Sequence, residues 1–419
     1  MKLKLVKGTR DLTGDSLERF RLIEEEAKRV LTLYGYKEIR LPLMESVDLF
    51  SHGIGEETDI VGKEMFLLRD RRQRCLALRP ESTAQVVRHV INNNSMRQNR
   101  YIKYFYAGPM FRYEQPQKGR HRQFYQIGAE YFGVSTPDAD LETILILRHL
   151  FRSINLDGVS FQINTIGCLK PECRPNFKKR LVRFFSEEGR ELCEDCKRRL
   201  NSNPLRILDC KNDRCASTTA DAPKIREEVC SDCAENFAEL RNLLERHGVV
   251  YTLNDKLVRG LDYYSRTVFE VYAENLGAQN AAGGGGRYDG LFEVFGAETV
   301  PAIGFALGLD RLTLLMDSPE TKQPDLFVVG RNRPVVAQTA ASCREAGFEC
   351  HYDPFLSSMK SQFRQANKLK ARLSLILGEK EIENGRIAVK DMQTGSQEEI
   401  AQNGLLQFLQ SRLKYRQQD

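Results

Sequence analysis

The alternation of apolar and polar positions predicts a chain of mixed helices and strands. Apolar residues recur at helical spacing from Leu17 to Tyr34, after a polar stretch in which Asp15 or Ser16 is the expected N-cap. Short alternating runs that are rich in aromatic residues predict strands in the segments 36–42, 64–70, 75–80, 101–114, 124–133 and 161–167. Alternation favours a mixed or antiparallel sheet over a doubly wound parallel one. We therefore expect an α+β fold.

The remaining segments divide the chain into two domains. A helix is expected from Asp138 to Phe151, strand signals resume at 260–273 and 281–296, and residues 302–316 are expected to be helical. The polar segment 317–324 contains two prolines and is the expected linker. Beyond it, predicted strands at 325–330, 348–353, 373–381 and 386–392 alternate with predicted helices at 337–346 and 358–370. This order predicts domains at residues 1–324 and 325–419, the second a small α/β domain with βαβ units.

Composition narrows the class of protein. A chain of 419 residues has room for two or three domains, and a hydrophobic content of 41% excludes disorder and a fibrous fold. No run approaches the roughly 18 apolar residues that span a bilayer, and the first residues do not resemble a signal peptide. We therefore expect a cytoplasmic protein with no membrane partner.

The net charge of +6 is small for a protein that coats nucleic acid. Binding of a nucleic acid would therefore need a local basic patch on this chain. Most of the surplus falls in the C-terminal segment 326–419. In a second region a single acid, Glu114, stands among the basic residues Arg97, Arg100, Lys103, Arg112, Lys118, Arg120 and Arg122. Both regions are candidate polyanion contacts, and the alternative for each is an ordinary solvated surface.

The eleven cysteines of an unexported chain are expected to be mostly reduced thiols. Eight of them form four pairs, Cys168/Cys173, Cys193/Cys196, Cys210/Cys215 and Cys230/Cys233. Two pairs have the C-x2-C spacing of zinc ligands, and four pairs would suffice for two sites of four cysteines each. The other two spacings are looser, and the flanking sequence has the pattern of ordinary helices. Structural Zn²⁺ and free thiols both remain open, and no catalytic metal site is predicted.

The segment 106–130 is predicted to be a β-hairpin, because two aromatic-rich strands flank a polar loop. Its loop carries Lys118, Arg120, His121 and Arg122. Arg112 would lie in a strand, where an inward-facing arginine needs an anion. A bound phosphate would serve, and so would a core salt bridge with Glu114 or Glu130.

Glycines elsewhere indicate positions where another group approaches the backbone. The small residues Gly304, Ala306 and Gly308 precede Arg311, and the alternative there is tight packing with Asp310 and Arg311 as surface charges. The four glycines 283–286 are not a Walker loop, because no Gly-Lys-Ser/Thr follows them. Apolar residues on both sides favour a strand that bulky groups approach over a flexible linker.

Five of these segments resemble motifs of the histidyl-tRNA synthetase family, which belongs to the class II aminoacyl-tRNA synthetases. FRYEQPQKGRHRQFYQIGAE is similar to class II motif 2, AIGFALGLDRL to motif 3, and YGYKEIRLPLMES, with Pro42, to motif 1. LVRGLDYYSRTVFEV and AAGGGGRYDGL resemble the two histidine-specific motifs, and KGTRDL and LRPESTAQVVR are also similar to that family. The resemblance covers essentially the whole chain.

The resemblance implies ATP-dependent ligation of L-histidine to histidine tRNA through a histidyl-adenylate, with release of AMP and diphosphate. Such activation requires positioning and charge stabilisation and no protein nucleophile. By resemblance, Arg112 would hold the α-phosphate of ATP, Arg311 the γ-phosphate, and Arg259 would stabilise the developing charge. Mg²⁺ would accompany ATP.

The resemblance also implies a histidine pocket that hydrogen-bonds both imidazole nitrogens. Glu130 and Tyr264 would make these bonds, with Tyr263 beside them. The α-amino group would be held by Glu81, Thr83 and Gln126. The alternative for Tyr263 is a packing role, and for Thr83 a helix cap. Ser82 stands where many relatives have glycine, and we expect it to change the pocket shape slightly without loss of function.

For the whole chain, the resemblance implies a class II catalytic domain whose antiparallel sheet is flanked by helices. A helical, cysteine-bearing insertion is expected at about 168–250, an anticodon-binding domain at 325–419, and a homodimer through motif 1. Arg120 or Arg122 would contact the acceptor end of tRNA. Two alternatives are a synthetase-like regulatory subunit of ATP phosphoribosyltransferase and an RNA-binding module with a decayed site. Both would have lost site arginines that are present here.

Overall fold

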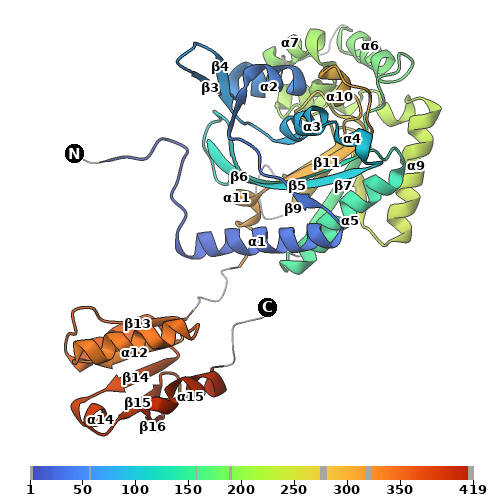
Figure 1. Cartoon of the computed structure of the whole chain (residues 1–419). Helices are drawn as coiled ribbons and strands as arrows, with labels where there is room; N and C mark the ends of the chain where they lie inside the picture. The colour runs from blue at the N-terminus through green and yellow to red at the C-terminus, as the bar shows by residue number, and fades with distance from the viewer. Residues whose placement is uncertain are drawn as a thin grey trace. The chain divides into compact units, whose positions relative to one another are not determined.

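The computed structural model describes residues 3–55, 58–156, 158–187, 191–273, 281–317 and 323–413. The chain forms two compact units, Met1–Pro319 and Glu320–Asp419 (Figure 1). Most of the predicted linker 317–324 lies outside the described residues.

The larger unit is built on an eight-stranded sheet with the order β1-β5-β6-β11-β10-β9-β7-β8. Its strands are β1 (Lys37–Glu38), β5 (Ile102–Phe111), β6 (Gln123–Phe132), β7 (Val159–Thr165), β8 (Tyr251–Leu253), β9 (Ser265–Ala273), β10 (Ala281–Arg287) and β11 (Ala302–Gly308). The outer pairs β1–β5 and β7–β8 are parallel, and the remaining pairs are antiparallel. The predicted mixed or antiparallel sheet, and the hairpin of β5 and β6, are therefore confirmed.

Helices cover both faces of this sheet, and each face has its own hydrophobic core (Figure 1). One face packs against α1 (Gly14–Leu33), α5 (Pro137–Ser153) and α9 (Ser231–Arg246). The other packs against α3 (Thr83–Asn92), α6 (Arg174–Phe185) and α10 (Leu291–Val294). Side chains alternate between the faces, so Phe105 belongs to the first core and Tyr106 to the second.

Helix α1 begins earlier than expected, with Thr13 at the N-cap position in place of Asp15 or Ser16.

A small sheet with the order β2-β4-β3 lies beside the large one. It consists of β2 (Met44–Ser46), β3 (Phe66–Arg69) and β4 (Cys75–Leu78), and near it are α2 (Val47–Ile54) and the π-helix η1 (Ile60–Glu64). Helix α4 (Ser95–Gln98) follows α3 and contacts it. Between β7 and β8 the described residues are mainly helical, as expected. This segment contains α6, α7 (Glu194–Ser202), η2 (Pro204–Ile207), α8 (Asp213–Ala220), η3 (Ile225–Glu227) and α9.

Residues 302–308 form strand β11, so the prediction of a helix over 302–316 is wrong for its first half. Only α11 (Leu309–Leu312) is helical there. Strand β11 lies between β6 and β10 and is covered on both faces, so its residues are apolar or small throughout and do not alternate. Such a run cannot be distinguished from a buried helix by periodicity alone.

A fully buried ion pair joins the sheet to α5. The Arg287 guanidinium donates to Asp140 Oδ2 from Nε at 2.8 Å and from Nη2 at 2.5 Å, and both side chains are 0% exposed. The carbonyls of Val134 and Thr136 accept from the same guanidinium at 3.0 and 2.7 Å. These contacts fix the end of the glycine-rich strand β10 against the start of the helix.

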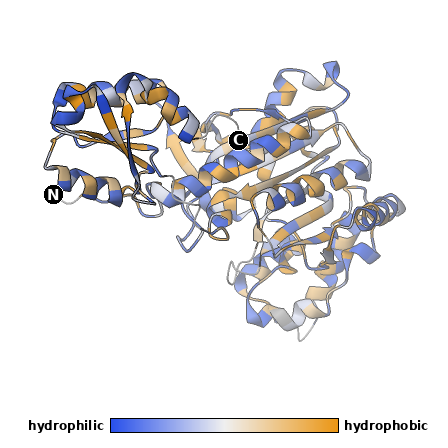
Figure 2. Ribbon diagram, turned by 90° about the horizontal axis from the view of Figure 1, so that it is seen from below, coloured by the Kyte–Doolittle hydropathy of each residue, from blue (hydrophilic) through white to orange (hydrophobic). Residues whose placement is uncertain are grey.

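The smaller unit is an α/β domain with the strand order β13-β12-β14-β15-β16. Its elements are β12 (Leu326–Gly330), α12 (Arg333–Glu345), β13 (Cys350–Tyr352), α13 (Met359–Lys368), β14 (Leu373–Leu377), α14 (Glu379–Glu383), β15 (Arg386–Asp391), β16 (Gln397–Ala401), η5 (Gln402–Gly404) and α15 (Leu405–Arg412). Strand β12 is parallel to β13 and β14, which confirms the predicted βαβ units. Hydrophobic residues concentrate on the strands and inner helix faces (Figure 2).

Candidate active site

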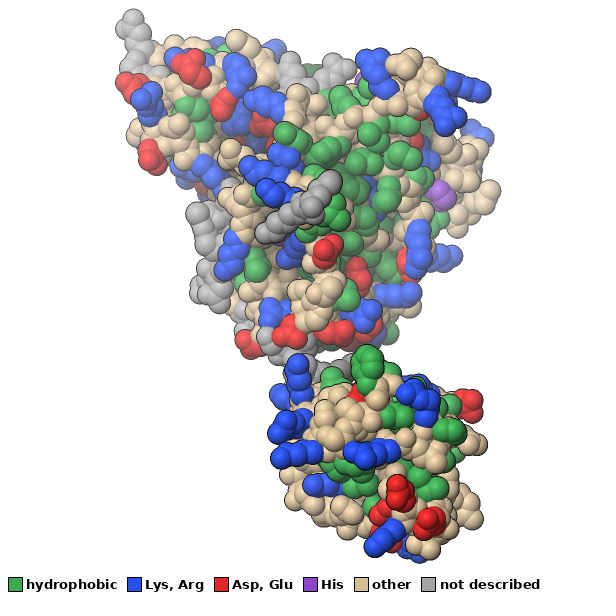
Figure 3. All heavy atoms as spheres, turned by 90° about the vertical axis from the view of Figure 1, so that its left-hand side faces the viewer, with side chains coloured by type: hydrophobic (Ala, Val, Ile, Leu, Met, Phe, Trp, Pro, Cys, Tyr) green, Lys and Arg blue, Asp and Glu red, His purple; other side chains and the backbone are tan. Residues whose placement is uncertain are grey.

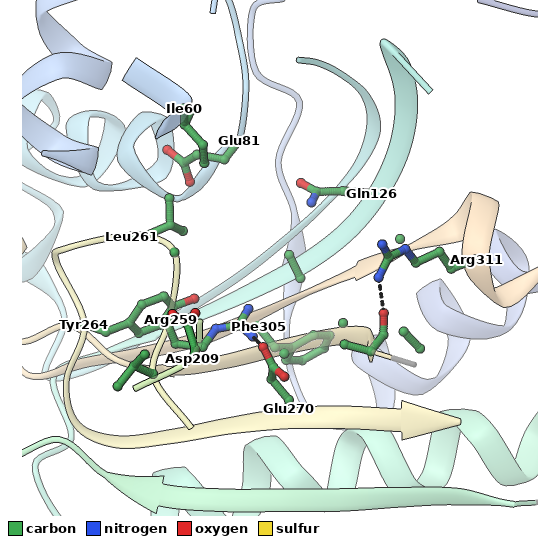
Figure 4. A pocket seen from close by; sticks show the side chains of 18 of the residues that line it. Ile60, Glu81, Gln126, Asp209, Arg259, Leu261, Tyr264, Glu270, Phe305 and Arg311 are labelled. Carbon is green, nitrogen blue, oxygen red and sulfur yellow. Dashed lines mark hydrogen bonds and ion pairs between the residues drawn. The ribbon is translucent and has the colours of Figure 1, made fainter. Parts of the chain in front are cut away.

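A cavity of about 720 Å³ opens over the middle of the large sheet (Figure 4). Its walls come from the β5–β6 hairpin, from β9, β10 and β11, from the loop 254–264 and from residues 206–211 of the helical segment. Among the predicted site residues, the cavity is lined by Glu81, Thr83, Arg112, Arg120, Gln126, Glu130, Arg259, Tyr263, Tyr264 and Arg311. Arg122 is not among the lining residues.

Glu130 lies at the closed end of the cavity, where three hydroxyl groups surround its carboxylate. Thr83 Oγ1 donates to Oε1 at 2.7 Å, Tyr106 OH donates to Oε1 at 3.3 Å, and Tyr288 OH donates to Oε2. Burial raises the pKa of Glu130 to about 8, although these hydroxyls act against the shift. The carboxyl can therefore change between an acceptor and a donor near neutral pH.

Glu81 caps the first turn of α3 with its carboxylate, which accepts from the amides of Thr83 at 2.6 Å and Ala84 at 3.0 Å. Burial raises the pKa of Glu81 despite these two bonds. The alternative of a helix cap at Thr83 is wrong, because Thr83 is the first residue of α3 and its hydroxyl is bonded to Glu130. The Ser82 hydroxyl turns away, toward Gln85 Oε1 at 3.4 Å.

Gln126 projects from β6 into the cavity (Figure 4). It lies in register with Gly108 of β5 and Gly308 of β11, so no side chain stands beside it on either neighbouring strand. Its buried Oε1 has no hydrogen-bond partner within the described parts of the chain. An unsatisfied acceptor of this kind is costly, which makes it a site for a donor on a ligand.

Tyr263 and Tyr264 are both buried, and their rings lie 4.7 Å apart. Tyr263 also packs against Tyr288, with ring centroids 5.6 Å apart, while both tyrosines line the cavity. Tyr263 therefore combines a packing contact with a place in the cavity wall. The carbonyl of Tyr264 accepts from the buried guanidinium of Arg174, which holds the loop from behind.

Arg259 reaches the cavity from the loop that precedes β9, and its Nη1 pairs with Glu270 Oε1 (Figure 4). The other carboxylate oxygen of Glu270 accepts from Tyr272 OH at 2.6 Å. Burial tends to lower the pKa of Arg259, but Glu270 together with Tyr264 and Tyr263 outweighs it, and the pKa is raised. The Nε atom of Arg259 is buried and has no hydrogen-bond partner among the described residues. The side chain is thus held in place with one donor left for a ligand.

Arg112 follows directly after β5, one residue beyond the strand in which it was expected. Its Nε donates to the carbonyl of Pro80 at 3.0 Å, and its guanidinium lies 5.5 Å from the Phe124 ring centroid. Within the described ranges it makes no ion pair with Glu114 or Glu130, so the core salt bridge considered as an alternative is absent there. A cationic group therefore faces the cavity.

Arg311 enters the other end of the cavity from α11, and its Nη1 donates to the carbonyl of Ala281. Burial, followed by the charge of Arg120, lowers its pKa. The neighbouring Asp310 is 3% exposed and accepts from Arg10 Nη2 at 2.6 Å and from the Tyr125 amide at 2.8 Å. Asp310 is therefore a buried support for the helix, and the alternative of a surface charge is wrong for it.

The hairpin loop places its two predicted tRNA-contacting arginines differently. Arg120 Nη1 pairs with Glu114 Oε2 at 3.0 Å, and its side chain remains 35% exposed. Arg122 is packed into the loop, because its Nε donates to the Glu114 carbonyl at 3.3 Å and its guanidinium lies 3.7 Å from the Tyr113 ring centroid. Lys103, also in the basic region, is ion-paired with Glu142 at 2.7 Å and is not a free polyanion contact.

The glycines of β10 and β11 leave room for these side chains, as the sequence predicted. A Cβ at Gly284 would lie 2.7 Å from Arg259 Nη1, and a Cβ at Gly285 would lie 2.0 Å from the carbonyl oxygen of Gly304. The four glycines therefore form a strand against which Arg259 and β11 pack closely.

Three residues of the site were missed from the sequence: Tyr106, Tyr288 and Glu270. Tyr288 stands in the same motif as the glycines, and Tyr106 lies opposite Gly128 in the β5–β6 register, so a large residue facing a glycine was a usable signal. Glu270 stands in the same motif as Arg259, 11 residues further along the chain, but no local pattern shows that its side chain turns back toward Arg259.

Comparison with known proteins gives matches over the whole chain. A family model described as histidyl-tRNA synthetase matches residues 8–312, and one described as anticodon binding domain matches residues 326–412. A histidine–tRNA ligase of Maridesulfovibrio salexigens is 43% identical over 408 residues, which cover 95% of this chain and 97% of the relative. One of Solidesulfovibrio magneticus is 45% identical over 426 residues and covers 100% of both. The crystal structure of apo S. aureus histidyl-tRNA synthetase has a TM-score of 0.81 at 32% identity and covers 97% of this chain and 100% of that one.

Proposed function

Since the chain belongs to the histidyl-tRNA synthetase family, we propose how the residues of its cavity carry out the reaction of that family. The protein is a class II histidine–tRNA ligase of protein biosynthesis. It joins the carboxylate of L-histidine to the α-phosphate of ATP, which releases diphosphate, and then transfers the histidyl group to histidine tRNA, which releases AMP.

The histidine side chain is proposed to enter the closed end of the cavity. Glu130 accepts an imidazole N–H, and the hydroxyl of Tyr264 contacts the other ring nitrogen with Tyr263 beside it. Since Glu130 is buried and already surrounded by hydroxyls, an analogue without a ring nitrogen would leave a polar group unpaired. Glu81, Thr83 and the unsatisfied oxygen of Gln126 are the proposed acceptors for the α-amino group.

Three arginines are proposed to hold ATP and the developing charge. Arg112 binds the α-phosphate, Arg311 the γ-phosphate, and Arg259 the oxygens of the reacting carboxylate and α-phosphate. This is supported by the unpaired Nε of Arg259 and by the absence of an acidic partner for Arg112 among the described ion pairs. Such fixed donors lower the barrier because they need no reorganisation when charge develops.

ATP is proposed to enter as its magnesium complex. Mg²⁺ prefers oxygen ligands, and the carboxylates of Glu114 and Glu270 line the cavity, so the residues present suit the ion. When bound, Mg²⁺ would offset the charge on the departing diphosphate.

The tRNA is proposed to contact both units. Arg120 and Arg122 belong to the hairpin loop at the cavity mouth, where the acceptor end would enter, and the domain 325–419 would bind the anticodon. Figure 3 shows Lys and Arg side chains gathered on one side of the smaller unit, which suits a phosphate backbone. The proposed catalytic domain is 1–324, with the helical segment at about 168–250 as its insertion.

We also propose a homodimer that works in the cytoplasm, where histidine tRNA is used. The support is an apolar surface in and near the predicted motif 1: Leu43, Met44 and Leu67 are 44%, 54% and 56% exposed. A hydrophobic area is visible on one face of the larger unit (Figure 3). Within the described part of the chain, none of the helices has the length and apolar character needed to cross a membrane.

The observation that carries the proposed mechanism is that Arg112, Arg259, Arg311 and Glu130 face a single cavity. Pyrophosphate exchange into ATP tests it: exchange should depend on histidine, and charging of histidine tRNA should follow. No exchange with folded protein would instead favour the regulatory-subunit alternative.

A further inference from the structure

The eight paired cysteines come together as two sets of four in space. The outer set is Cys168, Cys173, Cys230 and Cys233, and the inner set is Cys193, Cys196, Cys210 and Cys215. Within each set all four Sγ atoms lie within 4.8 Å of one another. The arrangement is nested, because the first pair along the chain joins the last pair and encloses the two middle pairs.

The spacing of the sulfur atoms suits a single tetrahedral ion. The Sγ–Sγ distances are 3.7 Å for Cys168–Cys230, 4.0 Å for Cys173–Cys233 and 3.8 Å for Cys193–Cys210. Four thiolates about 2.3 Å from one zinc ion lie about 3.8 Å apart at the corners of a tetrahedron. All eight cysteines are free thiols in the structure, so no disulfide competes for these sulfurs.

Both sets use the same local backbone. In each, a C-x2-C pair begins a helix: Cys193 is the N-cap residue of α7, and Cys230 is the N-cap residue of α9. The amide of that N-cap cysteine donates to a sulfur from the other pair, Cys193 to Cys215 Sγ at 3.2 Å and Cys230 to Cys173 Sγ at 3.4 Å. Amide donors to sulfur stabilise thiolates and orient metal ligands.

The surroundings of the outer set suit the negative charge of four thiolates. The guanidinium of Arg174, which is 7% exposed, interacts electrostatically with Asp262 and, after it, with Cys168, Cys173 and Cys233. Gly167 has a φ of +68°, and a Cβ there would lie 2.8 Å from Cys173 Sγ, so the chain leaves room for this sulfur. Three buried sulfurs and the half-buried Cys230 beside a buried cation favour a charged site over an apolar cluster of thiols.

We propose that each set of four cysteines binds one structural Zn²⁺. A four-iron cluster does not suit the spacing, because each of its thiolates is bound to a different iron and the sulfurs would lie farther apart. Both sites have four protein ligands and no open position, which is the arrangement of structural and not of catalytic zinc.

The two ions would brace the wall of the cavity. The outer site joins the end of β7 and the start of α6 to the start of α9, and Arg174, next to Cys173, holds the carbonyl of Tyr264. The inner site fixes Cys210, whose neighbours Asp209 and Lys211 line the cavity. Zinc at both sites would therefore support the cavity wall, to which Cys210 itself belongs.

Metal content of the full-length protein, expressed with added zinc and purified without chelators, tests the proposal. We expect about two zinc per chain by mass spectrometry, and zinc X-ray absorption should give four sulfur ligands at about 2.3 Å. Cys230→Ser and Cys210→Ser should each retain about one zinc. The exposed Cys75, which belongs to neither set, supplies the matched control, and Cys75→Ser should retain both ions.

A measurement on the unaltered protein covers the case in which these variants fail to fold. Titration with a mercurial reagent should release zinc in step with the modification of eight thiols. Zinc well below one equivalent in folded protein, with the eight thiols reacting freely, would overturn the proposal. Iron as the bound metal would overturn the assignment to zinc. Metal content is measured independently of aminoacylation, so the two proposals fail separately.

Discussion

The backbone of Gly304 passes so close to the Glu130 side chain that a Cβ at position 304 would lie 1.8 Å from Glu130 Oε2. The two residues are in register on neighbouring strands, β11 and β6. The absence of a side chain at position 304 therefore sets the position of the carboxylate that is proposed to select histidine.

Gly304→Ala should raise the KM for histidine by at least about tenfold, because a displacement of the Glu130 carboxylate by about 1 Å misplaces a key hydrogen bond. Histidine-dependent pyrophosphate exchange at varied histidine concentration measures this change. The control is Gly62→Ala, since a Cβ at Gly62 meets no atom within 4 Å. An unchanged KM in a folded Gly304→Ala protein would contradict the role of this contact.

Histidine binding at pH 7 should release close to one proton. Because its pKa is raised to about 8, Glu130 is mostly protonated in the empty pocket at pH 7. It must be ionised to accept an N–H from imidazole, which is itself mostly neutral above about pH 6.5. Histidine binding should therefore tighten by up to tenfold per pH unit from about 6.5 to 8.

Calorimetry in two buffers of different ionisation enthalpy measures the released proton. Glu130→Gln should bind histidine more weakly and lose both the proton release and the pH dependence. Proton uptake by the unaltered protein would mean that histidine binds in its cationic form to a neutral Glu130, contrary to the prediction.

Arg259→Ala should reduce the rate of histidine activation by about 10²–10³-fold, the usual loss for a donor that acts on transition-state charge. The Kd for histidine should change little.

Glu270→Gln removes the charge that holds Arg259 in place. It should lower the rate of histidine activation about tenfold, although Arg259 keeps its positive charge. Single-turnover adenylate formation measures both. Arg29→Ala, which removes an exposed pair with Glu26, is the control. Equal losses in histidine binding and turnover would instead indicate a binding role.

Arg120→Ala should lower kcat/KM for tRNA charging by about tenfold and leave pyrophosphate exchange nearly unchanged, because its exposed side chain can turn from Glu114 to a phosphate. Arg122→Ala should impair both reactions, since Arg122 packs against Tyr113 and supports the loop. Comparison of the exchange and charging assays separates these effects. A parallel loss of exchange in Arg120→Ala would assign Arg120 to ATP instead of tRNA.

Asp140→Ala should lower the free energy of unfolding by about 3–5 kcal/mol, because it removes the fully buried carboxylate nearest to Arg287 and leaves that charge with Asp289 at 3.6 Å. Glu26→Ala, which removes an exposed ion pair, should cost less than about 1 kcal/mol. Denaturant-induced unfolding measures both variants. Similar small losses would show that the surrounding carbonyls and Asp289 suffice to hold Arg287.

Much of the fold could be predicted because its elements carry local signals. The alternation in 101–114 and 124–133 correctly predicted β5 and β6, since one residue in two faces each core. The prediction failed at 302–308, where both faces of β11 are buried and alternation disappears. The grouping of the cysteines was also out of reach, because spacing along the chain says nothing about which pairs meet.

The residues of the site also divide into those that carry a local sequence signal and those that do not. Arg112 and Glu130 stand in recognisable motifs, and the structure places both in the cavity wall. The partners that tune them are contributed by distant segments: Tyr288 lies 158 residues from Glu130 along the chain, and Thr83 lies 47 residues from it. Such contacts depend on the register of the folded sheet, which no local pattern contains.

The nested cysteine sets imply an order of assembly during folding. Cys193 and Cys210 are 17 residues apart, whereas Cys168 and Cys230 are 62 residues apart. Closing the shorter loop costs less chain entropy, and once closed it shortens the flexible path between the outer cysteines. The inner set should therefore form first and guide the outer set. A nascent chain could complete the inner set before residue 230 has left the ribosome.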